Sequence, residues 1–135
     1  MKEMKKTLIG SFALLVLAAT FQSAAQKGSD VMTKEDGMTV INTTELGKQV
    51  TGYVGATPLK IYIKKNKVVK VEALKNQETP KYFAKVKKQL LQLWNDKKVS
   101  EAQKMKVDGV TGATFSSDAV IENVRLGLDY YQKHK

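Results

Sequence analysis

Ten residues near the C-terminus, Asp108 to Ser117, combine small side chains with four hydroxyl groups directly before a helical pattern. The hydroxyls belong to Thr111, Thr114, Ser116 and Ser117. A helix N-terminus presents unpaired N–H groups and the positive end of the helix dipole, so it suits an anion such as phosphate. Gly112 lets the backbone approach closely, Ala113 adds little bulk, and hydroxyls can donate to phosphate oxygens. The stretch predicts either an anion site or, as the simpler alternative, a helix cap with an incidental glycine.

Two helices are predicted from apolar residues at helical spacing. The last helix is expected to have Ser116 or Ser117 as its N-cap. Its buried stripe comprises Val120, Val124, Leu128 and Tyr131. An earlier helix is expected to begin at Pro80 with Thr79 as N-cap, because proline at the first helical position loses no intrahelical hydrogen bond. Its buried stripe comprises Phe83, Val86, Leu90 and Leu93 or Trp94, and another face carries Lys81, Lys85 and Lys88.

Alternating apolar residues predict a small antiparallel sheet. Residues 58–64 alternate, and the face expected to be buried carries Leu59, Ile61 and Ile63. Asn66 can take positive φ, so residues 65–67 are expected to form a hairpin turn. The return strand is expected to turn inward Val69, Val71 and Ala73. Further strands are expected over residues 38–42 and around Gly52, from Val50 to Val54. The fold class is therefore α+β, with helices packed on one face of a small antiparallel sheet.

The N-terminal region has the features of a secretory signal peptide. Three lysines precede an apolar run from Leu8 to Phe21, and Ser23 and Ala25 are small residues at the expected cleavage position. The run is 14 residues long, whereas a membrane-spanning helix needs about 20, so an uncleaved anchor is the weaker alternative. The expected organisation is a signal peptide over 1–25, a linker with a possible first strand over 26–48, and one domain over 49–135. The protein is accordingly expected outside the cytoplasm, in the periplasm or secreted.

The residue composition restricts the possible chemistry. The chain has no cysteine, and its one histidine is the second-last residue, His134. Disulfides, thiolate-held clusters, histidine catalysis and a metal site are therefore not expected. Any redox chemistry must come from an organic cofactor.

The chain is strongly basic, with a net charge of +10. Residues 1–25 hold three lysines and one glutamate, so their removal leaves +8. Among the 23 basic residues only Arg125 is an arginine, and lysine lacks the planar fork that recognises bases and phosphates. No aromatic residues alternate with the lysines to stack bases. Specific nucleic-acid binding is therefore not expected, and acidic partners or membrane headgroups are the expected counterparts of this charge.

The hydroxyl-rich stretch resembles the signature D-x-x-[ST]-G-A-T-x-[ST]-S of the FMN-binding domain family. That family includes the C subunit of the sodium-translocating NADH:quinone reductase and the G subunit of the Rnf complex. The order of the other segments is also similar, with Gly52-Tyr53 before a hairpin and Glu78-Thr79-Pro80 at the head of a helix. Asn76 stands where the family often has histidine, and Lys81 where it often has glycine. The resemblance covers about residues 49–130.

This resemblance implies FMN as the cofactor. Thr114 is similar to the threonine that carries FMN through a phosphoester bond, which a flavin transferase forms from FAD with Mg²⁺ and release of AMP. The transferase would recognise the neighbouring residues Asp108, Thr111, Gly112 and Ala113. Glu78 and Thr79 resemble residues that line the flavin, with a solvated helix cap as the alternative. Tyr53 is expected either to flank the ring or to be an ordinary strand residue.

The expected function is that of an exported flavoprotein that carries FMN covalently on Thr114 and moves electrons between extracytoplasmic partners. It needs no catalytic residue of its own, because the flavin performs the chemistry. The expected partners are the flavin transferase and redox proteins that are acidic or membrane-bound. Three alternatives stay open: a domain that holds FMN without a covalent bond, a flavin-dependent reductase acting on a small acceptor, and a flavin-free basic module that binds acidic surfaces.

Overall fold

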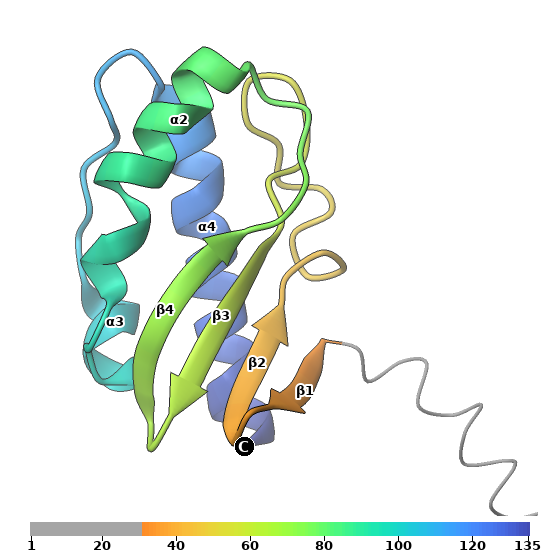
Figure 1. Cartoon of the computed structure of the whole chain (residues 1–135), viewed down its shortest axis with the longest axis vertical. Helices are drawn as coiled ribbons and strands as arrows, with labels where there is room; N and C mark the ends of the chain where they lie inside the picture. The colour runs from red at the N-terminus through yellow and green to blue at the C-terminus, as the bar shows by residue number, and fades with distance from the viewer. Residues whose placement is uncertain (1–30) are drawn as a thin grey trace, which may run out of the picture. The chain divides into compact units, whose positions relative to one another are not determined.

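The computed structural model describes residues 31–135, so the expected signal peptide and the first part of the expected linker lie outside the described residues. Figure 1 shows an antiparallel sheet in the order β1-β2-β3-β4. The strands are β1 (Met32–Glu35), β2 (Met38–Asn42), β3 (Leu59–Lys64) and β4 (Lys67–Ala73). β2 confirms the strand predicted over 38–42. β1 shows that the linker prediction was wrong for residues 32–35, because Asp36 and Gly37 take positive φ and form a two-residue hairpin turn between β1 and β2.

The hairpin of β3 and β4 confirms the predicted turn, since Lys65 and Asn66 both have positive φ. The predicted inward residues of β3 are buried, namely Leu59, Ile61 and Ile63. On β4 the alternation is interrupted by a β-bulge, because Tyr62 pairs with Lys70 while Ile63 pairs with Val68. Val69 is therefore the extra residue and is 37% exposed. The prediction that Val69 faces inward was wrong, and Val68 takes that place in the core.

The helices are α2 (Pro80–Gln89), the 3-10 helix η2 (Leu91–Trp94), α3 (Val99–Lys104) and α4 (Thr114–His134). α2 begins as predicted, with Thr79 as N-cap and Pro80 in its first turn. α3 lies in the lysine-rich connection and was not predicted. The predicted caps Ser116 and Ser117 were wrong, because α4 already begins at Thr114 with Ala113 as its N-cap.

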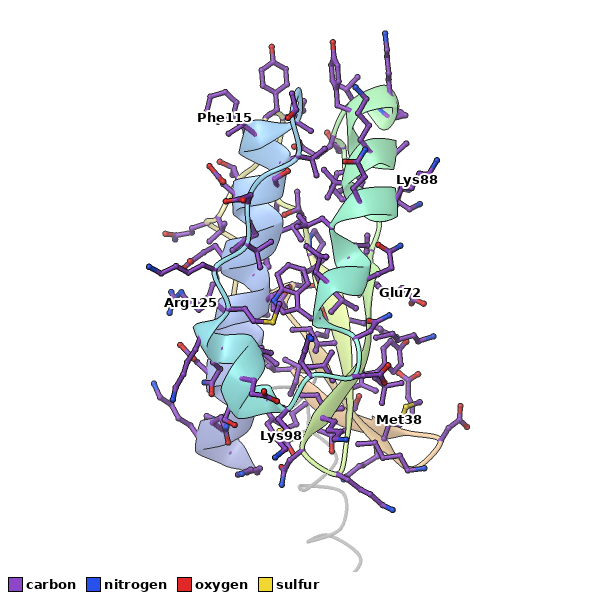
Figure 2. The ribbon with its side chains drawn as sticks, turned by 90° about the vertical axis from the view of Figure 1, so that its left-hand side faces the viewer. Met38, Glu72, Lys88, Lys98, Phe115 and Arg125 are labelled. Carbon is purple, nitrogen blue, oxygen red and sulfur yellow. The ribbon has the colours of Figure 1, made fainter. Side chains whose placement is uncertain are left out.

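The helices cover one face of the sheet (Figures 1 and 2), and the buried apolar residues between the two layers form a single core cluster. From the sheet it includes Ile41, Leu59, Ile61, Ile63, Val68 and Val71. The predicted stripe of α4 is buried in full, at Val120, Val124, Leu128 and Tyr131. This two-layer arrangement confirms the α+β class. Within residues 31–135, no helix has both the length and the apolar character needed to cross a membrane.

The strand predicted around Gly52 was wrong. Residues 43–58 connect β2 to β3 as a loop whose regular pairing is limited to an isolated bridge between Thr51 and Ala56. Gly52 donates its backbone N–H to the carbonyl of Gly55, which closes a tight turn at the tip of the loop. The backbone N–H groups of Tyr53, Val54 and Gly55 at this tip donate to the Glu78 carboxylate, so they do not pair with a strand.

Candidate functional site

The Glu78 carboxylate organises the site. It is 5% exposed and precedes α2 by two residues. The backbone N–H groups of Tyr53, Val54 and Gly55 donate to it over 2.7, 2.6 and 2.9 Å, and the Ser116 hydroxyl of α4 donates to it as well. One side chain therefore joins the loop tip, the start of α2 and the first turn of α4. The alternative of a solvated helix cap was wrong for Glu78.

The environment of Glu78 has two opposing effects on its pKa. Burial disfavours the charged carboxylate, while the hydrogen bonds from Ser116 and the three backbone N–H groups favour it. The hydrogen bonds outweigh burial and hold the pKa of Glu78 below its ordinary value. Glu78 is therefore an ionised structural anchor at neutral pH and holds no proton to donate.

Gly52 is required by the close approach of the loop to Glu78. A Cβ on residue 52 would lie 2.2 Å from Oε1 of Glu78 and 3.2 Å from Cα of Ser116. The second contact is with backbone and cannot be relieved by a side-chain rotation. Because residue 52 has no side chain, the loop can approach α4 closely, and the next residue, Tyr53, lies beside that helix.

The turn before α4 is held by Ser117, which is fully buried. Its hydroxyl accepts from the Val110 N–H at 2.9 Å and donates to the Ala113 carbonyl at 2.7 Å. Gly112 sits inside this turn with φ +85°, a conformation that favours glycine. Ala113 caps α4 without a side-chain hydrogen bond, so the N–H groups of the first turn receive no side-chain cap and suit an external anion.

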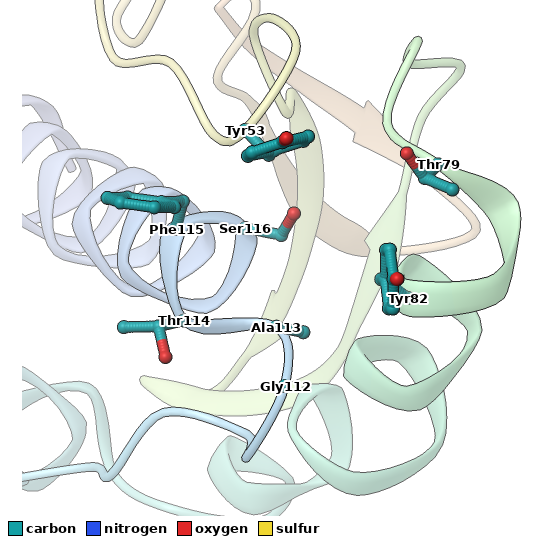
Figure 3. Close-up of a pocket in the computed structure, with 8 residues that line it drawn as sticks. All are labelled: Tyr53, Thr79, Tyr82, Gly112, Ala113, Thr114, Phe115 and Ser116. Atoms are coloured by element: carbon teal, nitrogen blue, oxygen red, sulfur yellow. The ribbon is translucent and has the colours of Figure 1, made fainter.

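A cavity of about 330 Å³ opens where the loop, α2 and the start of α4 meet. Figure 3 shows Tyr53 and Phe115 on one side of it and Thr79 and Tyr82 of the α2 segment on the other. The remaining lining residues are Gly112, Ala113, Thr114 and Ser116. The volume lies in the range of small-molecule and cofactor sites.

Three aromatic rings surround this cavity while remaining exposed to solvent. Tyr53 is 68% exposed, Phe115 65% and Tyr82 41%, so none of them belongs to the core. Tyr53 and Phe115 stack on each other with ring centroids 6.2 Å apart. Exposed apolar rings gathered beside a cavity mark a binding site for a ligand with a flat apolar part.

The structure brings most of the predicted site residues together. Those that line the cavity are Tyr53, Thr79, Gly112, Ala113, Thr114 and Ser116. Glu78 lies beside the cavity and bonds to Ser116. The predicted residues that do not line it are Asp108, Thr111 and Ser117, of which Asp108 and Thr111 are exposed and Ser117 is buried in the turn.

Sequence reasoning missed Tyr82 and Phe115 as lining residues. Both carried a usable signal. Tyr82 is three residues after Thr79, so it lies on the same helical face as a residue already placed at the site. Phe115 directly follows Thr114 and is an aromatic residue outside the apolar stripe of α4.

The cavity residues fit a phosphorylated flavin. The aromatic rings offer flat apolar surface for a ring system, while the uncapped first turn of α4 and the Thr114 hydroxyl suit a phosphate. When bound, FMN supplies one- and two-electron redox chemistry, and the protein supplies its binding, orientation and electrostatic environment.

Comparison with known protein families agrees with the fit of the cavity to a phosphorylated flavin. The model of the FMN-binding domain family matches residues 52–129, which include the loop tip, Glu78, α2 and the first turns of α4. No curated protein and no solved structure gives a significant match to the chain. Since the family match covers more than half of the 135 residues, the chain belongs to the FMN-binding domain family, and FMN is its cofactor.

Proposed function

We propose that this protein is an exported electron carrier that holds FMN covalently through a phosphoester bond to Thr114. The observation that supports Thr114 is its position among the hydroxyls of the motif. Ser117 is buried in the turn, Ser116 is buried and bonded to Glu78, and Thr114 lines the cavity with an exposed side chain. Thr111 is exposed but does not line the cavity.

The attachment reaction balances as a transfer from FAD. The Thr114 hydroxyl oxygen forms a bond to the phosphorus of the FMN half, the pyrophosphate bond to AMP breaks, and AMP leaves with the bridging oxygen while the hydroxyl proton is released. The product keeps one negative charge on its phosphodiester, which the N-terminal turn of α4 stabilises. The flavin transferase and Mg²⁺ are supplied in trans. Covalent attachment would keep the cofactor in place outside the cytoplasm whatever the concentration of free FMN there.

The electron-carrier role is supported by what the cavity contains. Its lining holds no carboxylate, histidine or lysine side chain, and the nearby Glu78 is held ionised by four hydrogen bonds. Apart from the phenol groups of Tyr53 and Tyr82, the lining offers a second substrate no side chain that commonly transfers protons. A carrier is therefore favoured over a reductase acting on a small acceptor, and family membership favours both over a flavin-free module.

We propose that the redox partners are acidic or membrane-bound, because the chain carries a net positive charge. A polar hollow of about 380 Å³ lies at the other end of α4 from the cavity. It is lined by Lys65, Lys67, Lys98 and Lys135 together with Asn66, Val99, Ser100 and Gln132. None of these lysines takes part in an ion pair formed among residues 31–135. We name this surface the lysine hollow.

The test of covalent attachment is the intact mass of the denatured protein, purified with and without a coexpressed flavin transferase. The expected result is a gain of one FMN less water on the peptide that contains Thr114, only when the transferase is present. Thr114→Ala should abolish the gain. Thr111→Ala, which removes the exposed hydroxyl three residues earlier, tests whether Thr114 is the specific acceptor. Yellow colour that is lost on denaturation, with an unmodified mass, would instead establish reversible FMN binding.

A further inference from the structure

The phosphate of FMN brings a negative charge that the cavity lining does not neutralise. All eight lining residues are uncharged. A helix N-terminus compensates only part of a unit charge, because its dipole is equivalent to about half an elementary charge. A cation close to the first turn of α4 would complete the site.

Lys85 of α2 places a cation near this turn. Its Nζ lies 3.8 Å from the position that a Cβ would take on Gly112, and Gly112 lines the cavity. The Lys85 side chain is exposed, and none of the ion pairs formed within residues 31–135 includes it. Its ammonium group is therefore close to the turn before α4 and has no acidic partner there to compete with a phosphate.

The neighbouring lysine Lys88 provides an internal comparison. It lies on the same helix and is also exposed. Figure 2 shows Lys88 on the side of α2 that faces away from Phe115 and α4. The two lysines share charge, helix and exposure, but only the ammonium group of Lys85 lies within 4 Å of the Cβ position on Gly112.

We propose that Lys85 binds the phosphate of FMN and makes the cavity select FMN over flavins without a phosphate. This inference rests on the proposed flavin site and assigns its phosphate-binding residue. The ammonium group donates a charge-assisted hydrogen bond to a phosphate oxygen, in a site where the backbone at Gly112 leaves room for the phosphate to approach. Riboflavin has the same ring system without the phosphate, so it gains nothing from Lys85.

The experiment titrates the full chain with FMN and with riboflavin and follows flavin fluorescence. The protein is purified from a host without flavin transferase, so that binding is reversible. The wild type is expected to bind FMN at least about ten-fold more tightly than riboflavin, which corresponds to one charge-assisted hydrogen bond. Lys85→Gln should weaken FMN binding by about ten-fold and leave riboflavin binding unchanged. Lys85→Arg should keep most of the preference because it keeps the charge.

Lys88→Gln is the matched control and should keep the wild-type ratio of the two affinities. Unchanged thermal unfolding of each variant shows that the fold is intact. A wild-type ratio retained in Lys85→Gln, or lost equally in Lys88→Gln, would overturn the assignment while leaving flavin binding in place. Equal affinity of the wild type for FMN and riboflavin would overturn it too. Failure of the wild type to bind either flavin would overturn Lys85 as a determinant of flavin affinity, whereas the intact mass separately decides whether FMN is attached to Thr114.

Discussion

Glu78 shows how one buried carboxylate can set the geometry of a cavity formed by three distant segments. Its oxygens accept from three consecutive N–H groups of the loop tip and from Ser116. Asn76 fixes the chain that leads to it, because its Oδ1 accepts from the Glu78 N–H at 3.0 Å and its Nδ2 donates to the Leu74 carbonyl at 3.1 Å. Asn76 thus closes the bend before α2 at the position where the family often has histidine.

Glu78→Gln is expected to lower the free energy of unfolding by about 2–3 kcal/mol at neutral pH, because hydrogen bonds to a charged acceptor are strong and an amide nitrogen cannot accept from an N–H. Urea unfolding measures the change. Glu122→Gln is the matched control, since Glu122 pairs with Arg125 on the surface and such pairs contribute under about 1 kcal/mol. A loss no larger than that of the control would contradict the anchoring role.

The effect of this substitution should also depend on pH. The pKa of Glu78 is lowered in the folded protein, so its stabilising effect is fully present above the unfolded-state value of about 4.3 and is lost as the pH falls through the folded-state value. The difference in unfolding free energy between wild type and Glu78→Gln is therefore expected to be largest at neutral pH and to shrink below about pH 4. A difference that grows on acidification would have the wrong sign.

Elements with local patterns could be predicted from the sequence, whereas those fixed by distant contacts could not. The β3–β4 hairpin and the buried stripe of α4 follow from alternation and helical spacing, and both are confirmed. The loop tip looked like a strand because Val50, Tyr53 and Val54 suit one. Its N–H groups instead donate to Glu78, which is more than twenty residues away in the sequence. A local sequence pattern cannot predict such a distant contact.

The same distinction applies to the site. The motif placed Gly112, Ala113 and Thr114 at the cavity, because contiguous residues stay together in any fold. Ser117 also carries a hydroxyl group of the kind that can bind a phosphate. In the fold this hydroxyl closes the turn instead, because it accepts from the Val110 N–H and donates to the Ala113 carbonyl. Tyr82 joins the cavity only because α2 packs beside α4. The relative positions of two helices are a tertiary property that spacing within either one does not determine.

Gly52→Ala tests how the loop element docks on α4. The added Cβ would collide with Oε1 of Glu78 and make a tight contact with the backbone at Ser116, so the loop must shift to relieve both contacts. The expected result is a loss of about 1–3 kcal/mol in the free energy of unfolding, together with weaker FMN binding because Tyr53 moves with the loop. Urea unfolding and an FMN titration measure the two effects.

Gly55→Ala is the control for the same loop, because a Cβ on residue 55 meets nothing within 4 Å and the N–H that donates to Glu78 is retained. It is expected to leave stability and FMN affinity close to those of the wild type. Equal effects of the two substitutions would mean that loop flexibility, and not the close approach at Gly52, controls the site.

On the scale of the whole domain, the cavity and the lysine hollow are separated by the length of α4. The cavity lies at the first turn of this helix and the lysine hollow at its last residues. A helix of 21 residues is about 30 Å long. A partner or membrane surface bound at the lysine hollow would therefore leave the flavin exposed at the other end for electron exchange.

The backbone holds two lysines of the hollow side by side. Lys67 and Lys98 form an isolated antiparallel bridge, and the Val99 N–H donates to the Asn66 carbonyl at 2.8 Å. The hairpin turn and the start of α3 therefore hold like charges side by side, which is unfavourable until an acidic surface neutralises them. Each lysine near an anionic membrane surface contributes about 1 kcal/mol of binding.

The triple substitution of Lys65, Lys67 and Lys98 to Gln is accordingly expected to weaken binding to vesicles with anionic lipids by about 100-fold at low salt. Binding of the wild type should fall steeply as salt is raised, because the interaction is electrostatic. Vesicle co-sedimentation measures both effects. The matched control replaces three exposed lysines of α2, namely Lys81, Lys87 and Lys88. An equal loss of affinity in both triple variants would mean that net charge alone controls binding and that the hollow has no special role. A loss confined to the first variant would mean that the hollow faces the membrane. The flavin at the other end of α4 would then point away from the membrane.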